Sequence, residues 1–162
     1  MSAIKTSEIA AFINTTPSST ATWERVKKQN ELKINYEAEM EEFTFVDEDG
    51  PTNEVERYKV GFGGEHVAYK GDPVFEYLDG IRQSRATGAA AVTEVLIVNI
   101  YDETSGVYSA EKNSATITIA GDFGGEGGGG KAYINYSVAF NGDPIKGTCT
   151  ITAGVPSFTA VS

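Results

Sequence analysis

Few residues in this chain have the types and spacing needed for chemistry, and the sharpest such motif is rich in glycine. Residues 125–131 (GEGGGGK) satisfy the first part of the phosphate-binding pattern GxxxxGK, in which backbone N–H groups cradle phosphate oxygens. That loop also needs a helix after it and a hydroxyl on the next residue to hold magnesium. Here the next residue is Ala132, and the sequence beyond it alternates like a strand. We therefore interpret the glycines as a connector between two strands.

The remaining candidates for chemistry are carboxylates, one histidine and one cysteine. Residues 47–50 (DEDG) look like the start of a calcium loop, but Pro51 and Tyr58 occupy two positions where that loop needs ligands. His66 has no nucleophile motif nearby, and a lone histidine cannot supply a histidine-rich metal cluster. Cys149 shares the parity of apolar neighbours, so packing is its expected role. The sequence predicts no catalytic residue, no metal site and no cofactor, and we expect that the protein is not an enzyme.

The balance of charge restricts the partners. The chain of 162 residues has 13 basic and 23 acidic residues and a formal net charge of −10. A surface of this sign does not attract phosphate or an anionic membrane, so nucleic-acid binding by charge is excluded. No stretch approaches the roughly 18 apolar residues that cross a bilayer. One cysteine cannot form an internal disulfide, and the first residues lack a secretory hydrophobic region, so we expect a reducing, aqueous location.

The elements that would position these residues are mostly strands. Alternating apolar residues predict strands near 32–36, 58–62, 66–69, 115–119 and 132–140. Residues 91–101 are apolar on both parities, which predicts a strand covered on both faces. The dipeptide Asn141-Gly142 predicts a hairpin turn between strands at 132–140 and 145–151.

One segment has the spacing of a helix. Asp72 is a good N-cap, Pro73 suits the first helical position, and Gly88 can close the helix. Between them, apolar residues recur three or four positions apart: Val74, Leu78 and Ile81. The spacing predicts a helix over about 73–87 that covers one face of the 91–101 strand. We therefore expect a mainly β fold, an antiparallel β-sandwich or barrel with one packed α-helix.

Composition divides the chain further. Residues 1–22, rich in Ser, Thr and Ala, are interpreted as an N-terminal arm and 155–162 as a C-terminal tail, on either side of a single domain over 23–154. Within that domain, 121–131 is expected to be a glycine-rich loop. The segment 37–56 has no Lys or Arg and carries the acidic residues Glu37, Glu39, Glu41, Glu42, Asp47, Glu48, Asp49, Glu54 and Glu56. The densest basic cluster consists of Arg25, Lys27 and Lys28.

Several stretches, taken together in chain order, carry a resemblance to a known family. They are 5–17 (KTSEIAAFINTTP), 23–26 (WERV), 67–86 (VAYKGDPVFEYLDGIRQSRA), 95–102 (VLIVNIYD) and 121–150, which contains AYINYSVAFNGDPIKGT. With this pattern the chain resembles the major tail tube proteins of tailed bacteriophages, in particular the short forms found in phages and prophages of Gram-positive bacteria. The resemblance covers most of the chain and includes the placement of the helix.

The resemblance implies a structural subunit that forms hexameric rings, stacked into a tube around an acidic channel that lets DNA pass without adhering. It implies a location in the virion tail, reached after assembly in the host cytoplasm, and no membrane. The main partner would be the chain itself; tape-measure, tail terminator and baseplate proteins, and a sheath in a contractile tail, would be others.

The resemblance also implies a role for the acidic segment. Residues 37–56 would form the long inter-ring loop or hairpin, with carboxylates that face either the lumen or the basic patch Arg25, Lys27 and Lys28 of the next subunit. A solvated, charged hairpin is the other interpretation. The alternative function is a monomeric ligand- or carbohydrate-binding β-sandwich module.

Overall fold

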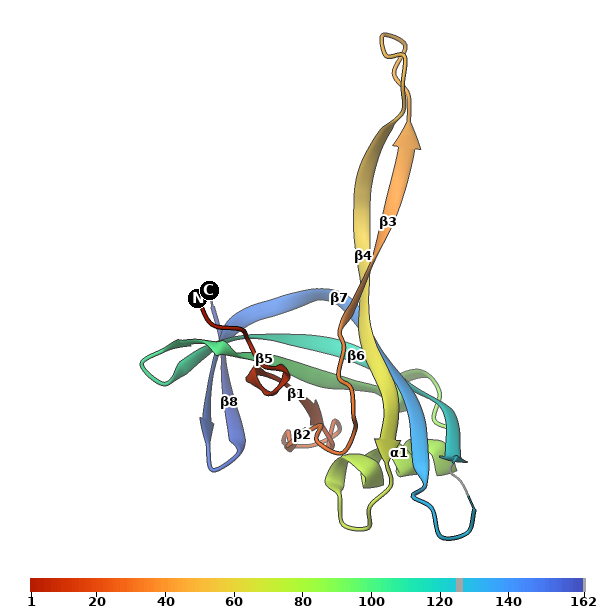
Figure 1. The fold of residues 1–162 in the computed structure, drawn as a ribbon, viewed down its shortest axis with the longest axis vertical. Helices are drawn as coiled ribbons and strands as arrows, with labels where there is room; N and C mark the ends of the chain where they lie inside the picture. Colours follow the sequence, from red (N-terminus) through yellow and green to blue (C-terminus); the bar gives the residue numbers. More distant parts are fainter. Residues whose placement is uncertain (125–126, 162) are drawn as a thin grey trace.

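The computed structural model describes residues 1–124 and 127–161. Its strands are β1 (Ile9–Asn14), β2 (Trp23–Arg25), β3 (Asn35–Phe43), β4 (Thr52–Val67), β5 (Val92–Thr104), β6 (Val107–Gly124), β7 (Tyr133–Thr152) and β8 (Val155–Ala160). One α-helix, α1 (Pro73–Ser84), and two 3-10 turns, η1 (Thr6–Glu8) and η2 (Gly88–Ala91), are the other elements of these residues. All strand pairs are antiparallel (Figure 1). The predicted mainly β fold with one helix is confirmed.

The strands form one continuous sheet. Two long strands, β6 and β7, hold it together, because they pair with each other in both of its halves. The strand order is β2-β1-β5-β6-β7-β4-β3, and β8 is added to β7. β7 pairs with β4 through residues 133–139 and with β8 through residues 147–152. β6 pairs with β7 along both parts. The layers expected of a sandwich or barrel are therefore joined by shared strands.

The core has two sides, and β1 and β5 lie between them. On the side of α1, the buried residues of these strands are Ala11, Ile13, Val95 and Ile97. On the other side they are Ala10, Phe12, Leu96 and Val98, which pack with Cys149 of β7 and Phe158 of β8. The prediction that 91–101 holds a strand covered on both faces, by the helix on one, is confirmed.

The helix begins where the sequence predicts and ends earlier. The Asp72 carboxylate accepts a hydrogen bond from the Val74 N–H at 3.3 Å, and Pro73 is the first helical residue. The buried face consists of the residues whose spacing predicted it: Val74, Leu78 and Ile81. The helix ends at Ser84 because Arg85 adopts the left-handed conformation (φ 48°) and its N–H bonds to the last carbonyls. Gly88 begins η2 instead of closing α1.

The structure differs from the predicted terminal arms. Instead of an arm, β1 is an inner strand that pairs with both β2 and β5, and Ala11 and Ile13 are fully buried. Residues 9–13 (IAAFI) are apolar at both odd and even positions. A strand of only six residues is too short for its periodicity to distinguish a buried strand from a docked arm. The carboxy-terminal segment likewise forms β8, which follows a two-residue turn at Ala153 and Gly154.

The dipeptide Asn141-Gly142 does not form the predicted hairpin. β7 runs through it, and residues 142–144 lie opposite Asn113 alone, so they form a bulge. Gly142 has φ 64°, a conformation that favours glycine in a bulge as well as in a turn. A tight two-residue turn occurs elsewhere, between β5 and β6. It consists of Ser105 and Gly106, which both have positive φ (53° and 79°).

Candidate self-association surface

The acidic segment forms a hairpin that projects from the body of the molecule. β3 and β4 pair over residues 35–61, whereas β4 meets β7 only from Gly61 onward. Residues 36–60, named the hairpin from here on, therefore form a two-stranded ribbon without a third strand (Figure 1). Two-stranded ribbons are marginally stable by themselves in water. The hairpin form expected for 37–56 is thus observed, and no strand of the body pairs with it in the described residues.

The hairpin is rooted at two glycines. A Cβ on Gly61 would collide with the Val138 carbonyl of β7, and one on Gly63 would collide with the Tyr136 carbonyl. β4 and β7 therefore approach more closely here than a side chain on that face allows. This close pairing fixes the direction in which β4 leaves the body.

One face of the hairpin is apolar. The register places Tyr36 opposite Val60, Ala38 opposite Tyr58, and Met40 opposite Val55, and we name these six residues the apolar stripe. Tyr36, Met40 and Tyr58 are each 58–62% exposed. Val60 and Tyr58 of the stripe lie on the same side of β4 as Phe62. Phe62 is part of the core and only 3% exposed. The face that β4 buries in the body is therefore exposed along the hairpin.

The opposite face of the hairpin is charged. The Glu39 carboxylate forms ion pairs with Arg57 and with Lys59, the latter at 2.7 Å. Hydrogen bonds from Arg57 and then Lys59 lower the pKa of Glu39 from 4.5 to about 2. Farther out, Glu41 lies directly opposite Glu54, a pairing of like charges. The base of this face is thus neutralised within the chain, and its outer part is not.

A groove lies where the hairpin meets the body. It has a volume of about 680 Å³, and its apolar wall includes Ile9, Leu32, Ile34 and Ile97. Tyr36 belongs to this wall and also to the apolar stripe, so the two apolar surfaces are continuous. Lys33 and Lys146 are among the polar residues of the groove. Leu32 and Ile34, which the sequence placed in a strand, precede β3 and contribute to the groove instead.

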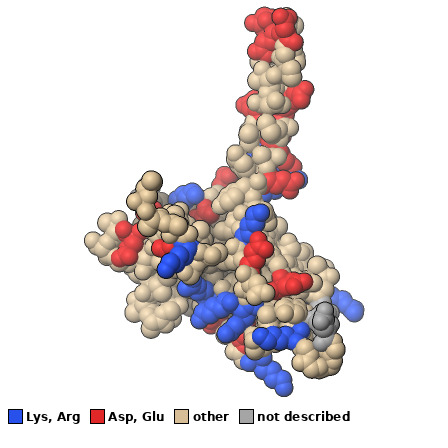
Figure 2. All heavy atoms as spheres, viewed as in Figure 1, with Lys and Arg blue, Asp and Glu red and all other residues tan. Residues whose placement is uncertain are grey.

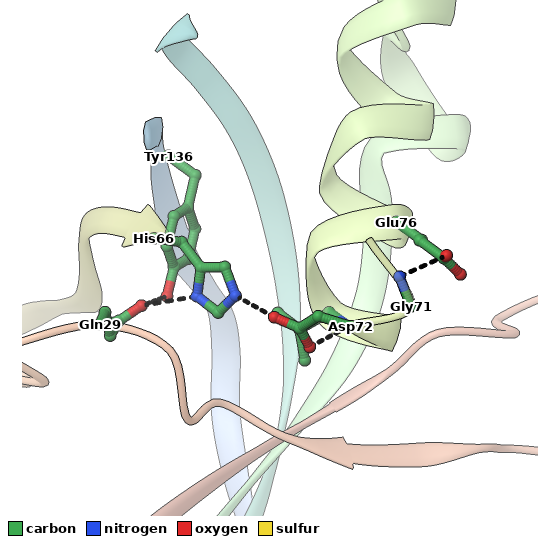
Figure 3. A network of polar contacts seen from close by, with 7 residues as sticks. Gln29, His66, Gly71, Asp72, Glu76 and Tyr136 are labelled. Atoms are coloured by element: carbon green, nitrogen blue, oxygen red, sulfur yellow. Dashed lines mark hydrogen bonds and ion pairs between the residues drawn. The ribbon is translucent and has the colours of Figure 1, made fainter. Parts of the chain in front are cut away.

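A buried polar network holds the inner end of β4 (Figure 3). His66 is fully buried; its Nε2 lies 2.7 Å from Asp72 Oδ2 and its Nδ1 3.3 Å from Gln29 Oε1. The Tyr136 hydroxyl donates to the same Gln29 oxygen at 2.6 Å. Burial raises the pKa of Tyr136, which keeps this hydroxyl a donor. The network ties β4 to the start of α1 and to the segment that follows β2.

The predicted acidic and basic candidates lie at different places. All the acidic candidates are in the hairpin or its end loop, whereas Arg25 lies in β2 and donates to the Ser7 carbonyl at 3.1 Å. The Lys28 ammonium lies 5.5 Å from the centre of the Tyr69 ring. Within the described residues, no ion pair joins the two sets. Figure 2 shows carboxylates toward the end of the hairpin, and Lys and Arg gathered around the end of the body that carries α1.

The sequence missed the apolar stripe and the groove, although part of the signal was present. The alternation of Glu37, Glu39 and Glu41 with Ala38 and Met40 predicted an acidic face. The separate alternation at 58–62 held the other half of the stripe. Only the register of β3 and β4 shows that the two sets face the same way.

Other kinds of site find no support in the described part of the chain. Its His, Cys, Asp and Glu side chains include no group of three or more suited to a metal ion. Its helices include none long and apolar enough to cross a membrane. Of the glycine-rich run that resembled a phosphate loop, residues 125 and 126 lie outside the described residues.

The similarity of this chain to known proteins lies in its fold. No family model matches the chain, and no curated protein matches it. Among solved structures, it is similar to a chain of the tail of an empty GTA (gene transfer agent) particle, reconstructed by helical refinement with C6 symmetry. The TM-score is 0.63 and the identity 18%, over 98% of this chain and 100% of that one. The two chains therefore share a fold over their whole length.

Proposed function

We propose that this chain is a structural subunit of a phage-like tail tube, and that its copies assemble into stacked hexameric rings. The observation that carries the proposal is the hairpin, whose apolar stripe has four large side chains that are 44–62% exposed: Tyr36, Met40, Val55 and Tyr58. Exposed apolar surface of this kind is typical of protein interfaces. The fold shared over its full length with a chain of a C6-symmetric tail supports the same function.

In this proposal the face of the sheet opposite α1 lines the channel. Its exposed residues in β6 and β7 are small and uncharged, among them Thr118, Ser137 and Ala139. The cation of β6 on this side, Lys112, forms an ion pair with Glu94 at 3.3 Å, so the residues named above give DNA an uncharged surface. Acidic character in the channel would then come from the hairpins, with Glu37 at the base and the remaining acidic candidates farther out. The basic candidates Arg25, Lys27 and Lys28 would face the acidic residues of an adjacent ring.

Electron microscopy of the concentrated, purified protein tests the proposal. We expect tubes, or rings with six-fold symmetry, whose formation depends on ionic strength because each subunit carries a formal charge of −10. A protein that stays monomeric at all concentrations and salt conditions would contradict the proposal.

The same experiment addresses the alternative of a monomeric ligand-binding module. The observation that favours the alternative is the groove of about 680 Å³ with its apolar wall. A monomer with this groove open to small apolar ligands would support that alternative. Tubes in which the groove is closed would support self-assembly.

A further inference from the structure

The apolar stripe and the groove meet at Tyr36 and form one corner, with the hairpin as one wall and the body as the other. We propose that this corner, named the seat from here on, receives a second copy of this chain, which enters with the end that carries α1. The inference rests on the proposed function and specifies the partner and the contact surface of the hairpin.

The pattern of burial along β4 indicates that the seat is covered in the assembled protein. Phe62 and Tyr58 are aromatic, lie on the same side of one strand, and are separated by four positions. Phe62 is 3% exposed and Tyr58 is 59% exposed. Leaving large apolar side chains in water forfeits the free energy that their burial would supply. A partner in the seat would extend the core side of β4 along the whole strand.

The charges indicate which part of the second copy enters. The outer hairpin carries Glu41, Glu42, Glu54 and Glu56, and no described Lys or Arg forms an ion pair with them. The end of the body that carries α1 is rich in Lys and Arg (Figure 2). Opposite charges at the rim favour this orientation and disfavour one that brings two acidic hairpins together.

The basic end also has an apolar residue to place against the stripe. Tyr69 is 41% exposed, and the Lys28 ammonium lies 5.5 Å from the centre of its ring. Tyr69 and Lys28 therefore present an aromatic surface beside a positive charge. The seat presents the complement, an apolar stripe beside carboxylates. We assign most of the affinity to the apolar stripe and the orientation to the charges.

Two matched substitutions test the stripe. Val55→Ser changes a stripe residue that is 44% exposed, and Val155→Ser makes the same change at a position of β8 that is 62% exposed and outside the seat. Tyr58→Ser is the stronger stripe variant. We expect Tyr58→Ser to raise the concentration needed for tube formation by about tenfold or more, and Val155→Ser to leave it unchanged. The readout is sedimentation of tubes, checked by electron microscopy.

The outcomes separate the seat from the proposed function. Wild-type protein that never assembles would contradict both. Wild-type tubes together with unchanged assembly of Tyr58→Ser and Val55→Ser would overturn the seat alone. Thermal unfolding of the dilute monomer detects a folding defect, and we expect none because these side chains are already exposed.

Cross-linking tests the orientation. Met40→Cys and Tyr69→Cys place single reactive thiols on the stripe and at the basic end, while Cys149 is buried. We expect a short bis-maleimide to join the two variants when they are mixed and assembled. Cross-links that form only between two copies of Met40→Cys, or no cross-link between the two variants, would overturn the assignment of the basic end.

Discussion

The inner and outer parts of β4 show how one strand can belong to two environments. In the body, Phe62 and His66 are buried among residues of this chain, and β4 pairs with β7 from Gly61 to Val67. In the hairpin, Val55 and Tyr58 continue the same side of the strand but are exposed. The alternation of apolar residues does not stop where the chain's own core stops. Under the proposed function, the outer part of this pattern reflects burial against a second copy, whereas the inner part reflects burial in the monomer.

Removing the hairpin should have the largest effect, because it takes away the exposed part of β4 and leaves the buried part. If residues 38–54 are deleted, so that 55–58 form a short loop between the paired Glu37 and Lys59, we expect a folded monomer that forms no tubes, because the hairpin contributes no residue to either buried core. Thermal unfolding and electron microscopy measure the two effects separately. A deletion variant that still forms tubes would show that the hairpin is not an assembly element.

Truncation of one apolar residue in the body and one in the hairpin should change the free energy of unfolding by different amounts. Leu96 is fully buried, so Leu96→Ala should lower the free energy of unfolding by about 3 kcal/mol. Tyr58→Ala should change it by less than about 0.5 kcal/mol in the monomer, because the ring is already exposed. Denaturant unfolding at a concentration below that of assembly measures both. Equal losses would mean that the monomer already uses the stripe.

Loss of the polar network should weaken the junction between β4 and α1. Asp72→Ala removes the helix N-cap and also the acceptor that lies 2.7 Å from His66 Nε2. We expect a loss of about 2 kcal/mol in the free energy of unfolding. Asp72→Asn keeps a cap and an acceptor and serves as the control. If Asp72→Ala and Asp72→Asn unfold alike, the contacts of the Asp72 carboxylate are not what stabilises the junction.

The smallest effect is expected on the charged face of the hairpin. The pKa of Glu39 is lowered from the ordinary value of 4.5 to about 2 in the folded chain. Ionised Glu39 therefore stabilises the hairpin fully when the pH is above 4.5. That contribution falls as the pH drops from 4.5 through 2, where Glu39 becomes protonated and its pairs with Arg57 and Lys59 weaken. Exposure to water makes the effect on overall stability slight. Carboxyl NMR should show Glu39 titrating well below pH 4.5, and an ordinary titration of Glu39 would contradict the ion pairs.

The sequence predicted the elements whose signals are local. Asp72, Pro73 and the spacing of Val74 and Leu78 predicted the helix start and its buried face, because capping and helical periodicity act within a few residues. The run at 91–101, apolar at both odd and even positions, predicted β5 because this signal too lies within one short stretch of sequence. The end of α1 was less predictable, since Arg85, which is not glycine, adopts the left-handed conformation.

The sequence did not predict the features that depend on distant partners. β1 pairs with β5, more than eighty residues away, and no local signal distinguishes that strand from a docked arm. The bulge at Gly142 uses the same dipeptide as a hairpin turn, so only the pairing with β6 separates the two. The acidic composition predicted a charged hairpin, whereas its apolar stripe required the register between Met40 and Val55. The inter-ring and lumen roles of the charged residues stay predictions.

The central position of β1 has a consequence for how the protein is made. A ribosome produces β1 first, yet this strand cannot complete its pairing with β5 until the chain has been translated past residue 99, several seconds later at about 5–20 residues per second. Both strands of the hairpin, by contrast, have been made once residue 67 is translated. The wall of the groove includes both Ile9 and Ile97, so the groove cannot form until β5 has been made and has paired with β1. If this groove receives a second copy, as proposed, a nascent chain cannot receive one before its own residue 97 has been made.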